Sequence, residues 1–140
     1  MGDVKSLYPS VLTIAGSDSG GCAGIQADIK SISACGAYAA SVITASTAQN
    51  TQGVFDIHSI PINHIKNQLA AVLDDIKFNA IKIGMLNSSE IIELVKMKLL
   101  KYRVENIVID PVMLSTSGHK LINDDAINSL KKFLPNATLI

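Results

Sequence analysis

Apolar and polar positions alternate along the chain with two different periods. Short runs rich in valine and isoleucine predict strands at residues 11–15, 38–45, 80–85 and 106–110. Apolar residues spaced three or four positions apart predict helices at residues 24–36, 63–77, 87–102 and 123–134. Strands that alternate with helices are typical of an α/β fold, so we expect a mainly parallel sheet with helices on both faces.

Local sequence features predict a loop, an edge strand, two helix starts and a final strand in the remaining segments. Residues 46–53 are polar and predict an irregular loop, which leads into a short edge strand at residues 54–60. Asn87, with a glutamate three residues later, is typical of a helix N-cap, and Asn123 with the two aspartates after it predicts the start of the last helix. Residues 137–140 predict a strand that the end of the sequence cuts short.

In parallel sheets of this kind, ligands bind beyond the carboxyl ends of the strands. Four segments follow predicted strands and should meet at one rim, namely residues 16–24, 44–50, 84–86 and 110–113. The first segment holds four glycines and leads into a helix. Glycine allows close approach of the backbone, and the free N–H groups of a helix start favour polar or anionic atoms, so the pattern predicts a small-molecule pocket. The spacing is neither a Gly-x-Gly-x-x-Gly fingerprint nor a P-loop, because no Lys-Ser/Thr pair follows Gly21.

Composition narrows the classes of function. A chain of 140 residues fits one domain with one core. Twelve basic and twelve acidic residues give a formal net charge of zero, which provides no electrostatic basis for binding nucleic acid or an anionic membrane. No apolar run approaches the roughly 18 residues of a membrane span, and no apolar segment of a secretory signal is present near Met1. Cys22 and Cys35 form no metal-ligand spacing or disulfide framework, so we expect a cytoplasmic domain.

The four rim segments and their surroundings resemble the hydroxymethylpyrimidine and phosphomethylpyrimidine kinases of thiamine biosynthesis, within the ribokinase-like superfamily. The matching text runs in order through residues 12–30, 36–38, 41–45, 48–54, 82–86 and 108–113. This resemblance implies phosphorylation, dependent on ATP and magnesium, of the hydroxymethyl group of 4-amino-5-hydroxymethyl-2-methylpyrimidine and then of its monophosphate. It also implies a ribokinase-like fold and a homodimer.

The resemblance carries roles for particular residues. It places seven residues against the pyrimidine, namely Gly16, Ala23, Asp28, Thr47, Gln49, Met85 and Val112. Gln49 would hydrogen-bond the aminopyrimidine edge, because one amide presents a donor and an acceptor together. Asp28 would lie near the reactive hydroxymethyl end, and the polarizable thioether of Met85 would contact the ring. Asp110 matches the acidic residue near the nucleotide phosphates and magnesium, a cation that needs oxygen ligands.

The same residues also have ordinary structural explanations. Gln49 is compatible with a surface loop, and Asp28 with a solvated or capping carboxylate of the first helix. Met85 and Val112 stand at strand ends, where plain core residues are common. Asp110 is compatible with the cap of a turn after a strand.

The sequence departs from the family near residues 138–140. In relatives this strand continues into a Thr-Pro-Asn segment and a further large part of the domain. That part holds most of the adenine-binding surface and a Gly-Thr-Gly-Cys motif, which supplies the anion hole and the proposed catalytic cysteine. The 140 residues contain no such motif. We therefore expect residues 1–140 to be the N-terminal portion of a single kinase domain, with no catalytic residue among them and no activity alone.

Alternatives remain at this point. The chain is compatible with a truncated longer kinase, which we favour, and with a short protein that assembles with a complementary chain. A pyridoxal or pyridoxine kinase is the nearest enzymatic rival, although residues 48–50 follow the pyrimidine-kinase pattern. A pyrimidine-binding module without transferase chemistry is the non-enzymatic one.

Overall fold

The computed structural model describes residues 8–114, 118 and 120–140. In chain order, the elements are β1 (Ser10–Asp18), α1 (Gly24–Ala34), β2 (Tyr38–Asn50), β3 (Gly53–Ser59), α2 (Ile62–Leu73), β4 (Ala80–Ile83), α3 (Ser89–Lys101), β5 (Ile107–Ile109), α4 (Asp124–Phe133) and the 3₁₀ helix η1 (Leu134–Asn136). The five strands form one sheet in the order β3-β2-β1-β4-β5. All neighbouring pairs are parallel except β2 and β3, as the alternating pattern predicts for a mainly parallel sheet.

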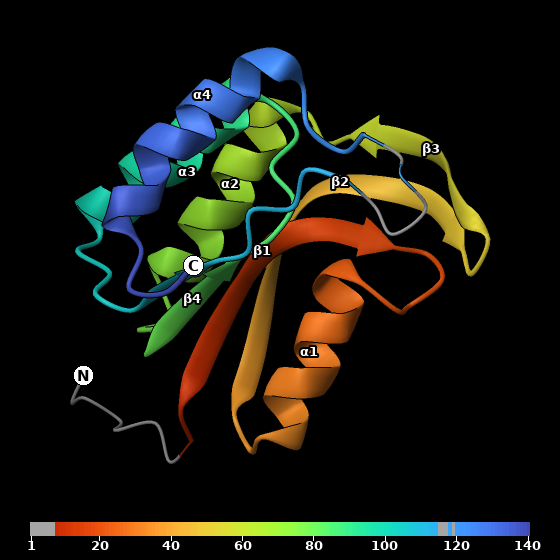
Figure 1. Cartoon of the computed structure of the whole chain (residues 1–140). Helices are drawn as coiled ribbons and strands as arrows, with labels where there is room; N and C mark the ends of the chain where they lie inside the picture. The colour runs from red at the N-terminus through yellow and green to blue at the C-terminus, as the bar shows by residue number, and fades with distance from the viewer. Residues whose placement is uncertain (1–7, 115–117, 119) are drawn as a thin grey trace.

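Helices cover both faces of this sheet, which confirms the expected layers. Figure 1 shows α1 on one face and α2, α3 and α4 on the other. Side chains alternate between the faces along each strand. On β1, Leu12 and Ile14 are fully buried in the core shared with α2, α3 and α4, whereas Thr13 between them hydrogen-bonds Asp28 of α1.

The apolar core lies on the side of α2, α3 and α4. Its largest fully buried side chain is Phe133 of α4, which belongs to the same cluster as Leu99 of α3 and Leu69 of α2. The apolar stripes that predict these helices are therefore the surfaces that bury them. None of the helices in the described part of the chain is long and apolar enough to cross a membrane.

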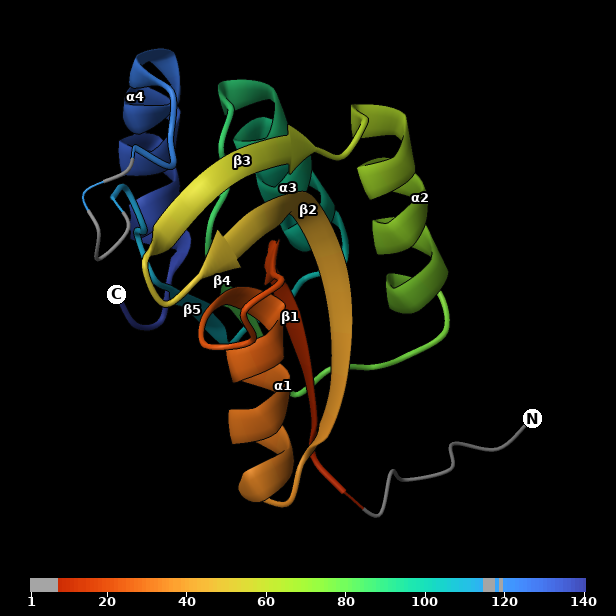
Figure 2. The same ribbon diagram turned by 90° about the vertical axis from the view of Figure 1, so that its right-hand side faces the viewer.

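The prediction of an irregular loop at residues 46–53 is wrong. Residues 46–50 continue β2, which pairs with β3 from Ala45 opposite Ser59 to Asn50 opposite Gly53. The side chains of this stretch are polar, but backbone hydrogen bonds to β3 hold it extended, so the side-chain pattern carries no signal of the strand. Figure 2 shows β2 as a long, curved strand paired with β3.

The expected N-cap at Asn87 is also wrong. The cap of α3 is Ser88, whose Oγ accepts a hydrogen bond from the backbone N–H of Ile91 at 3.3 Å. The side chain of Asn87 instead donates to Oγ of Ser59 at 2.6 Å, so it is engaged by a distant segment. Asn123 does occupy the cap position of α4, but its side chain makes no capping hydrogen bond there.

Two further boundaries differ from the pattern. Helix α2 ends at Leu73 and β4 at Ile83, both before the apolar periodicity ends.

The strand predicted at residues 137–140 is not an independent element of the structure. These residues run parallel to β5, where the backbone N–H of Thr138 donates to Ile107 O and that of Ile109 donates to Leu139 O.

Candidate functional site

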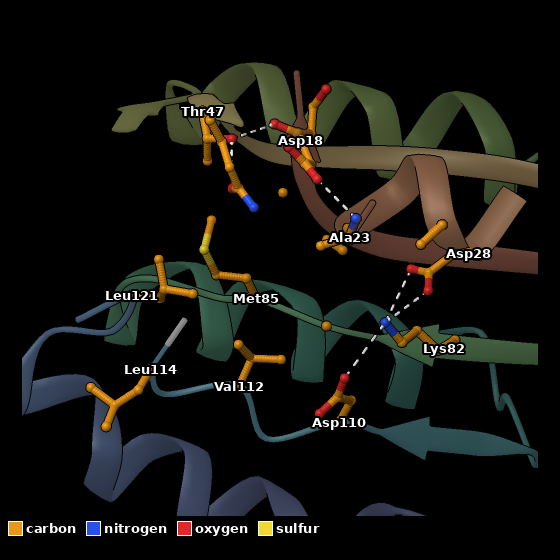
Figure 3. A pocket seen from close by; sticks show the side chains of 17 residues that line it. Asp18, Ala23, Asp28, Thr47, Lys82, Met85, Asp110, Val112, Leu114 and Leu121 are labelled. Carbon is orange, nitrogen blue, oxygen red and sulfur yellow. Dashed lines mark hydrogen bonds and ion pairs between the residues drawn. The ribbon is translucent and has the colours of Figure 1, made fainter. Parts of the chain in front are cut away.

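A pocket of about 300 Å³ lies at the carboxyl end of the parallel strands (Figure 3). All four predicted rim segments contribute to its lining, as the topology of a parallel sheet requires. The lining includes every residue singled out from the sequence, namely Gly16, Ala23, Asp28, Thr47, Gln49, Met85, Asp110 and Val112. The structure thus brings these eight residues together, while the role of each remains a prediction.

The glycine-rich turn between β1 and α1 is organised by Asp18, which is 3% exposed. Its Oδ1 accepts a hydrogen bond from the N–H of Gly20 at 2.8 Å. Its Oδ2 accepts from the N–H groups of Cys22 at 2.9 Å and Ala23 at 2.8 Å. The protein's own carboxylate therefore stands beside the start of α1, where the helix dipole favours negative charge. Sequence reasoning expected a ligand atom at such N–H groups and missed Asp18.

Two glycines of the site are closely surrounded, and Gly24 is required there by both its positive φ and the backbone next to it. A Cβ on Gly24, whose φ is +54°, would lie 2.2 Å from the carbonyl oxygen of Gly16. A Cβ on Gly16 would lie 2.6 Å from Cε of Met85. The end of β1, the start of α1 and the Met85 side chain therefore pack directly on one another at the floor of the pocket.

The polar end of β2 is tied to the glycine-rich turn. Oγ of Ser19 accepts a hydrogen bond from the backbone N–H of Gln49 and donates to its carbonyl oxygen, both at 2.8 Å. Oγ1 of Thr47 lies 3.1 Å from Ser17 O and 3.2 Å from Oε1 of Gln49. Gln49 is thus part of a paired strand whose backbone is held by two hydrogen bonds, and the surface-loop explanation does not describe it.

Lys82 also lines the pocket, and the sequence patterns did not predict it as a site residue. Nζ of Lys82 lies 3.0 Å from Oδ1 and 3.1 Å from Oδ2 of Asp28, and 3.9 Å from Oδ2 of Asp110 (Figure 3). The hydroxyl of Thr13 donates to Oδ2 of Asp28 at 2.6 Å. Lys82 and Thr13 each interrupt an apolar strand, and that interruption was the available signal. Asp28 is paired and held, so it is neither a helix cap nor a freely solvated carboxylate.

Asp110 differs from the other two carboxylates of the pocket. Its side chain is 57% exposed, and its Oδ2 lies 3.9 Å from Nζ of Lys82. Among the described residues, no group of three or more histidines, cysteines or acidic residues could hold a metal ion. One exposed carboxylate nevertheless fits Mg²⁺, which is commonly bound through one or two carboxylates together with phosphate and water oxygens.

Comparison with known proteins agrees with the geometry. Residues 18–140 match the family model described as phosphomethylpyrimidine kinase. The chain belongs to the phosphomethylpyrimidine kinase family. It is 51% identical over 131 residues to a hydroxymethylpyrimidine/phosphomethylpyrimidine kinase from Haemophilus influenzae, covering 93% of this chain and 49% of that protein. With the enzyme of the same name from Escherichia coli, identity is 46% over 132 residues, or 94% of this chain and 50% of that protein.

Solved structures of this and a neighbouring kinase family share the fold. The crystal structure of phosphomethylpyrimidine kinase from Clostridium difficile has a TM-score of 0.86 and 52% identity, and the match covers 92% of this chain and 56% of that one. Pyridoxal kinase from Staphylococcus aureus in complex with pyridoxal has a TM-score of 0.85 and 31% identity, covering 96% and 49%. These likenesses confirm the expected ribokinase-like fold. The chain spans about half the length of the single-function kinases it matches.

Proposed function

We propose that this chain binds 4-amino-5-hydroxymethyl-2-methylpyrimidine or its monophosphate, as the acceptor side of an ATP-dependent kinase of thiamine biosynthesis. The observation that carries the proposal is the meeting of the Gln49 amide, the Met85 thioether and the Val112 side chain in one pocket. The pocket volume of about 300 Å³ is at the lower end of the range for small-molecule sites, which suits a single substituted ring.

Each wall of the pocket has a part in this proposal. The amide of Gln49 offers a donor and an acceptor to the amino-substituted edge of the ring. The thioether of Met85 packs on the ring face, since sulfur makes favourable contacts with aromatic rings. Gly16 and Ala23 leave space for the ring, and Asp28, held by Lys82, borders the hydroxymethyl end.

We propose that only one residue of this chain, Asp110, has a role in binding the phosphate donor. Asp110 would hold Mg²⁺ together with nucleotide oxygens, and the ion would neutralise charge on the transferring phosphoryl group. The 140 residues contain no Gly-Thr-Gly-Cys motif, so we propose that they bind the pyrimidine without turning it over. The single kinase domain, the homodimer and the cytoplasmic location expected from the sequence remain predictions. Light scattering on the purified chain tests the homodimer.

A pyridoxal kinase is the second candidate, favoured by the likeness to the Staphylococcus aureus enzyme that binds pyridoxal. The ring of pyridoxal lacks the amino-substituted pyrimidine edge with which Gln49 would form hydrogen bonds. The identity to phosphomethylpyrimidine kinases is higher, at 52% against 31% for the two solved structures, and supports the pyrimidine.

Isothermal calorimetry with the purified chain tests the proposal. We expect the aminopyrimidine to bind more tightly than pyridoxal, and Gln49→Ala to weaken the pyrimidine about tenfold or more, because two hydrogen bonds are lost. Gln52→Ala is the matched control, since Gln52 lies exposed in the turn after β2 and does not line the pocket. Tighter pyridoxal binding that ignores Gln49→Ala would reject the pyrimidine, and robust ATP-dependent turnover by the chain alone would reject its inactivity.

A further inference from the structure

In the proposed function, Gln49 recognises the ring through its side-chain amide. This side chain has three rotatable bonds, so the orientation of its amide must be fixed by neighbouring residues. Gln49 stands immediately after an irregularity in the pairing of β2 with β3, between Ala48 and Gln49. Bulges of this kind redirect a side chain and are common beside binding sites. The residues that contact Gln49 therefore decide how its amide faces the pocket.

The backbone of Gln49 is fixed from the glycine-rich turn. The hydroxyl of Ser19 exchanges two hydrogen bonds of 2.8 Å with the backbone of Gln49, one as acceptor and one as donor. Beside it, a Cβ on Gly20 would lie 3.1 Å from the carbonyl oxygen of Gln49, so the turn packs closely on this residue. The position of Gln49 is thus set by contacts from a segment thirty residues earlier in the chain.

The side-chain amide of Gln49 lies within hydrogen-bond distance of Thr47, two residues earlier on the same strand. Thr47 is 7% exposed, and its hydroxyl oxygen lies 3.2 Å from Oε1 of Gln49. The hydroxyl has one proton, which it donates either to this oxygen or to Ser17 O at 3.1 Å. When Oε1 is bound, it keeps a second lone pair, and Nε2 keeps both protons. The amide then presents one acceptor and one donor side by side to a ligand.

We propose that Thr47 and Ser19 are positioning residues that set the specificity of Gln49 for a ring edge with an amino donor beside a nitrogen acceptor. Ser19 holds the backbone of Gln49, and Thr47 holds its amide oxygen before the ligand arrives. This inference rests on the proposed function, because it deepens the role of Gln49 in binding the aminopyrimidine. It gives Thr47 a polar role in addition to the ring contact that the family resemblance implies.

The first test needs no ligand. The side-chain amide of Gln49 gives a pair of NMR signals, which are assigned by their loss in Gln49→Ala. We expect Thr47→Val, which keeps the shape and removes the hydroxyl, to shift this pair and bring its two protons closer to the values of a free amide. Thr47→Ser, which keeps the hydroxyl, should restore the wild-type signals. An amide pair that is unchanged in Thr47→Val would overturn the proposal.

The second test is a double-mutant cycle by calorimetry with the aminopyrimidine. We expect Thr47→Val to weaken binding about fivefold and Ser19→Ala about threefold, as the loss of single hydrogen bonds implies. In the Gln49→Ala background, both changes should have little further effect, because the group that they position is absent. Ser46→Ala is the control, since Ser46 is exposed on β2 and does not line the pocket.

The outcomes separate the two proposals. Equal losses from Thr47→Val with and without Gln49 would overturn the positioning role while leaving pyrimidine binding intact. Failure of the wild-type chain to bind the aminopyrimidine would overturn the proposed function, and the NMR experiment would still decide whether Thr47 holds the amide.

Discussion

The two faces of the sheet are built from the same strands and serve different purposes. Toward α2, α3 and α4, the strands present fully buried apolar residues such as Ile14 and Ile81. Toward α1, the neighbouring positions are Thr13 and Lys82, which meet Asp28 of that helix. Helix α1 itself has a single buried residue, Ile25. Because side chains alternate along a strand, one strand supplies both the core and the pocket.

This difference indicates which face specifies the fold and which one is available for chemistry. Apolar burial is the dominant favourable term in folding, and most of it lies under α2, α3 and α4. The polar face must instead satisfy each buried donor and acceptor, which Thr13, Asp28 and Lys82 do among themselves. We therefore expect substitutions on the first face to change mainly stability, and substitutions on the second face to change binding as well.

The largest expected effect is on the apolar face. Phe133→Ala should lower the free energy of unfolding by about 3–5 kcal/mol, because it removes the largest fully buried side chain and leaves a cavity. Urea unfolding followed by circular dichroism measures the change. Phe55→Ala is the matched control, since this phenylalanine is 67% exposed on β3 and its loss should cost no more than about 0.5 kcal/mol. Equal losses for the two variants would contradict the assignment of the core.

The next effect is on the polar face. Lys82→Met should lower the free energy of unfolding by about 2 kcal/mol, because it leaves the carboxylate of Asp28 without its ion pair. The value is below that of a deeply buried pair, since the side chains of Lys82 and Asp28 are 24% and 15% exposed. Unlike Phe133→Ala, the change should also weaken binding of the aminopyrimidine, because Asp28 and Lys82 line the pocket. Calorimetry and urea unfolding on the same samples test both statements.

A double variant sharpens this result. Asp28→Leu with Lys82→Met removes both charges and should recover much of the stability lost in Lys82→Met, since a buried pair can often be replaced by apolar residues. Pyrimidine binding should not recover with it. Recovery of both quantities together would show that the polar face contributes to stability alone.

Much of this architecture was predictable because it depends on local patterns. The apolar periods predicted the strands and helices, since the positions that create the periods are those buried in the core. The extension of β2 through residues 46–50 was missed, because its ladder to β3 consists of backbone groups. Ser88 was missed as a cap because Asn87, an equally good capping residue, bonds to Ser59 instead.

The site divides in a similar way. The rim rule and the family resemblance placed Gln49, Met85 and Asp110 together, and the pocket confirms that meeting. The sequence did not reveal Lys82 as the partner of Asp28, because that contact joins positions 54 residues apart. The break in the apolar pattern of β4 marks Lys82 as unusual, but it does not identify the residue that Lys82 contacts.

The smallest expected effect lies outside both faces. Tyr102 follows α3, and its hydroxyl donates a hydrogen bond to Oδ1 of Asp74, which follows α2. This hydrogen bond, with smaller contributions from desolvation and from the charge of Asp74, raises the pKa of Tyr102 above its ordinary value of about 10. The neutral phenol is therefore favoured in the folded state. Its contribution to stability is complete below the ordinary pKa and is lost as the pH rises through the raised pKa of the folded state.

The hydrogen bond between Tyr102 and Asp74 tests how much a polar contact between the ends of α2 and α3 contributes to stability. We expect the wild type to lose slightly more stability than Tyr102→Phe between pH 8 and pH 11, since the variant has no phenol to ionise. Asp74→Asn should reduce the same difference, because it removes the carboxylate that raises the pKa of Tyr102. Urea unfolding at the two pH values measures it. A pH dependence as large as the loss in Phe133→Ala would contradict the comparison, because a surface hydrogen bond would then rival the apolar core in holding α2 and α3 in place.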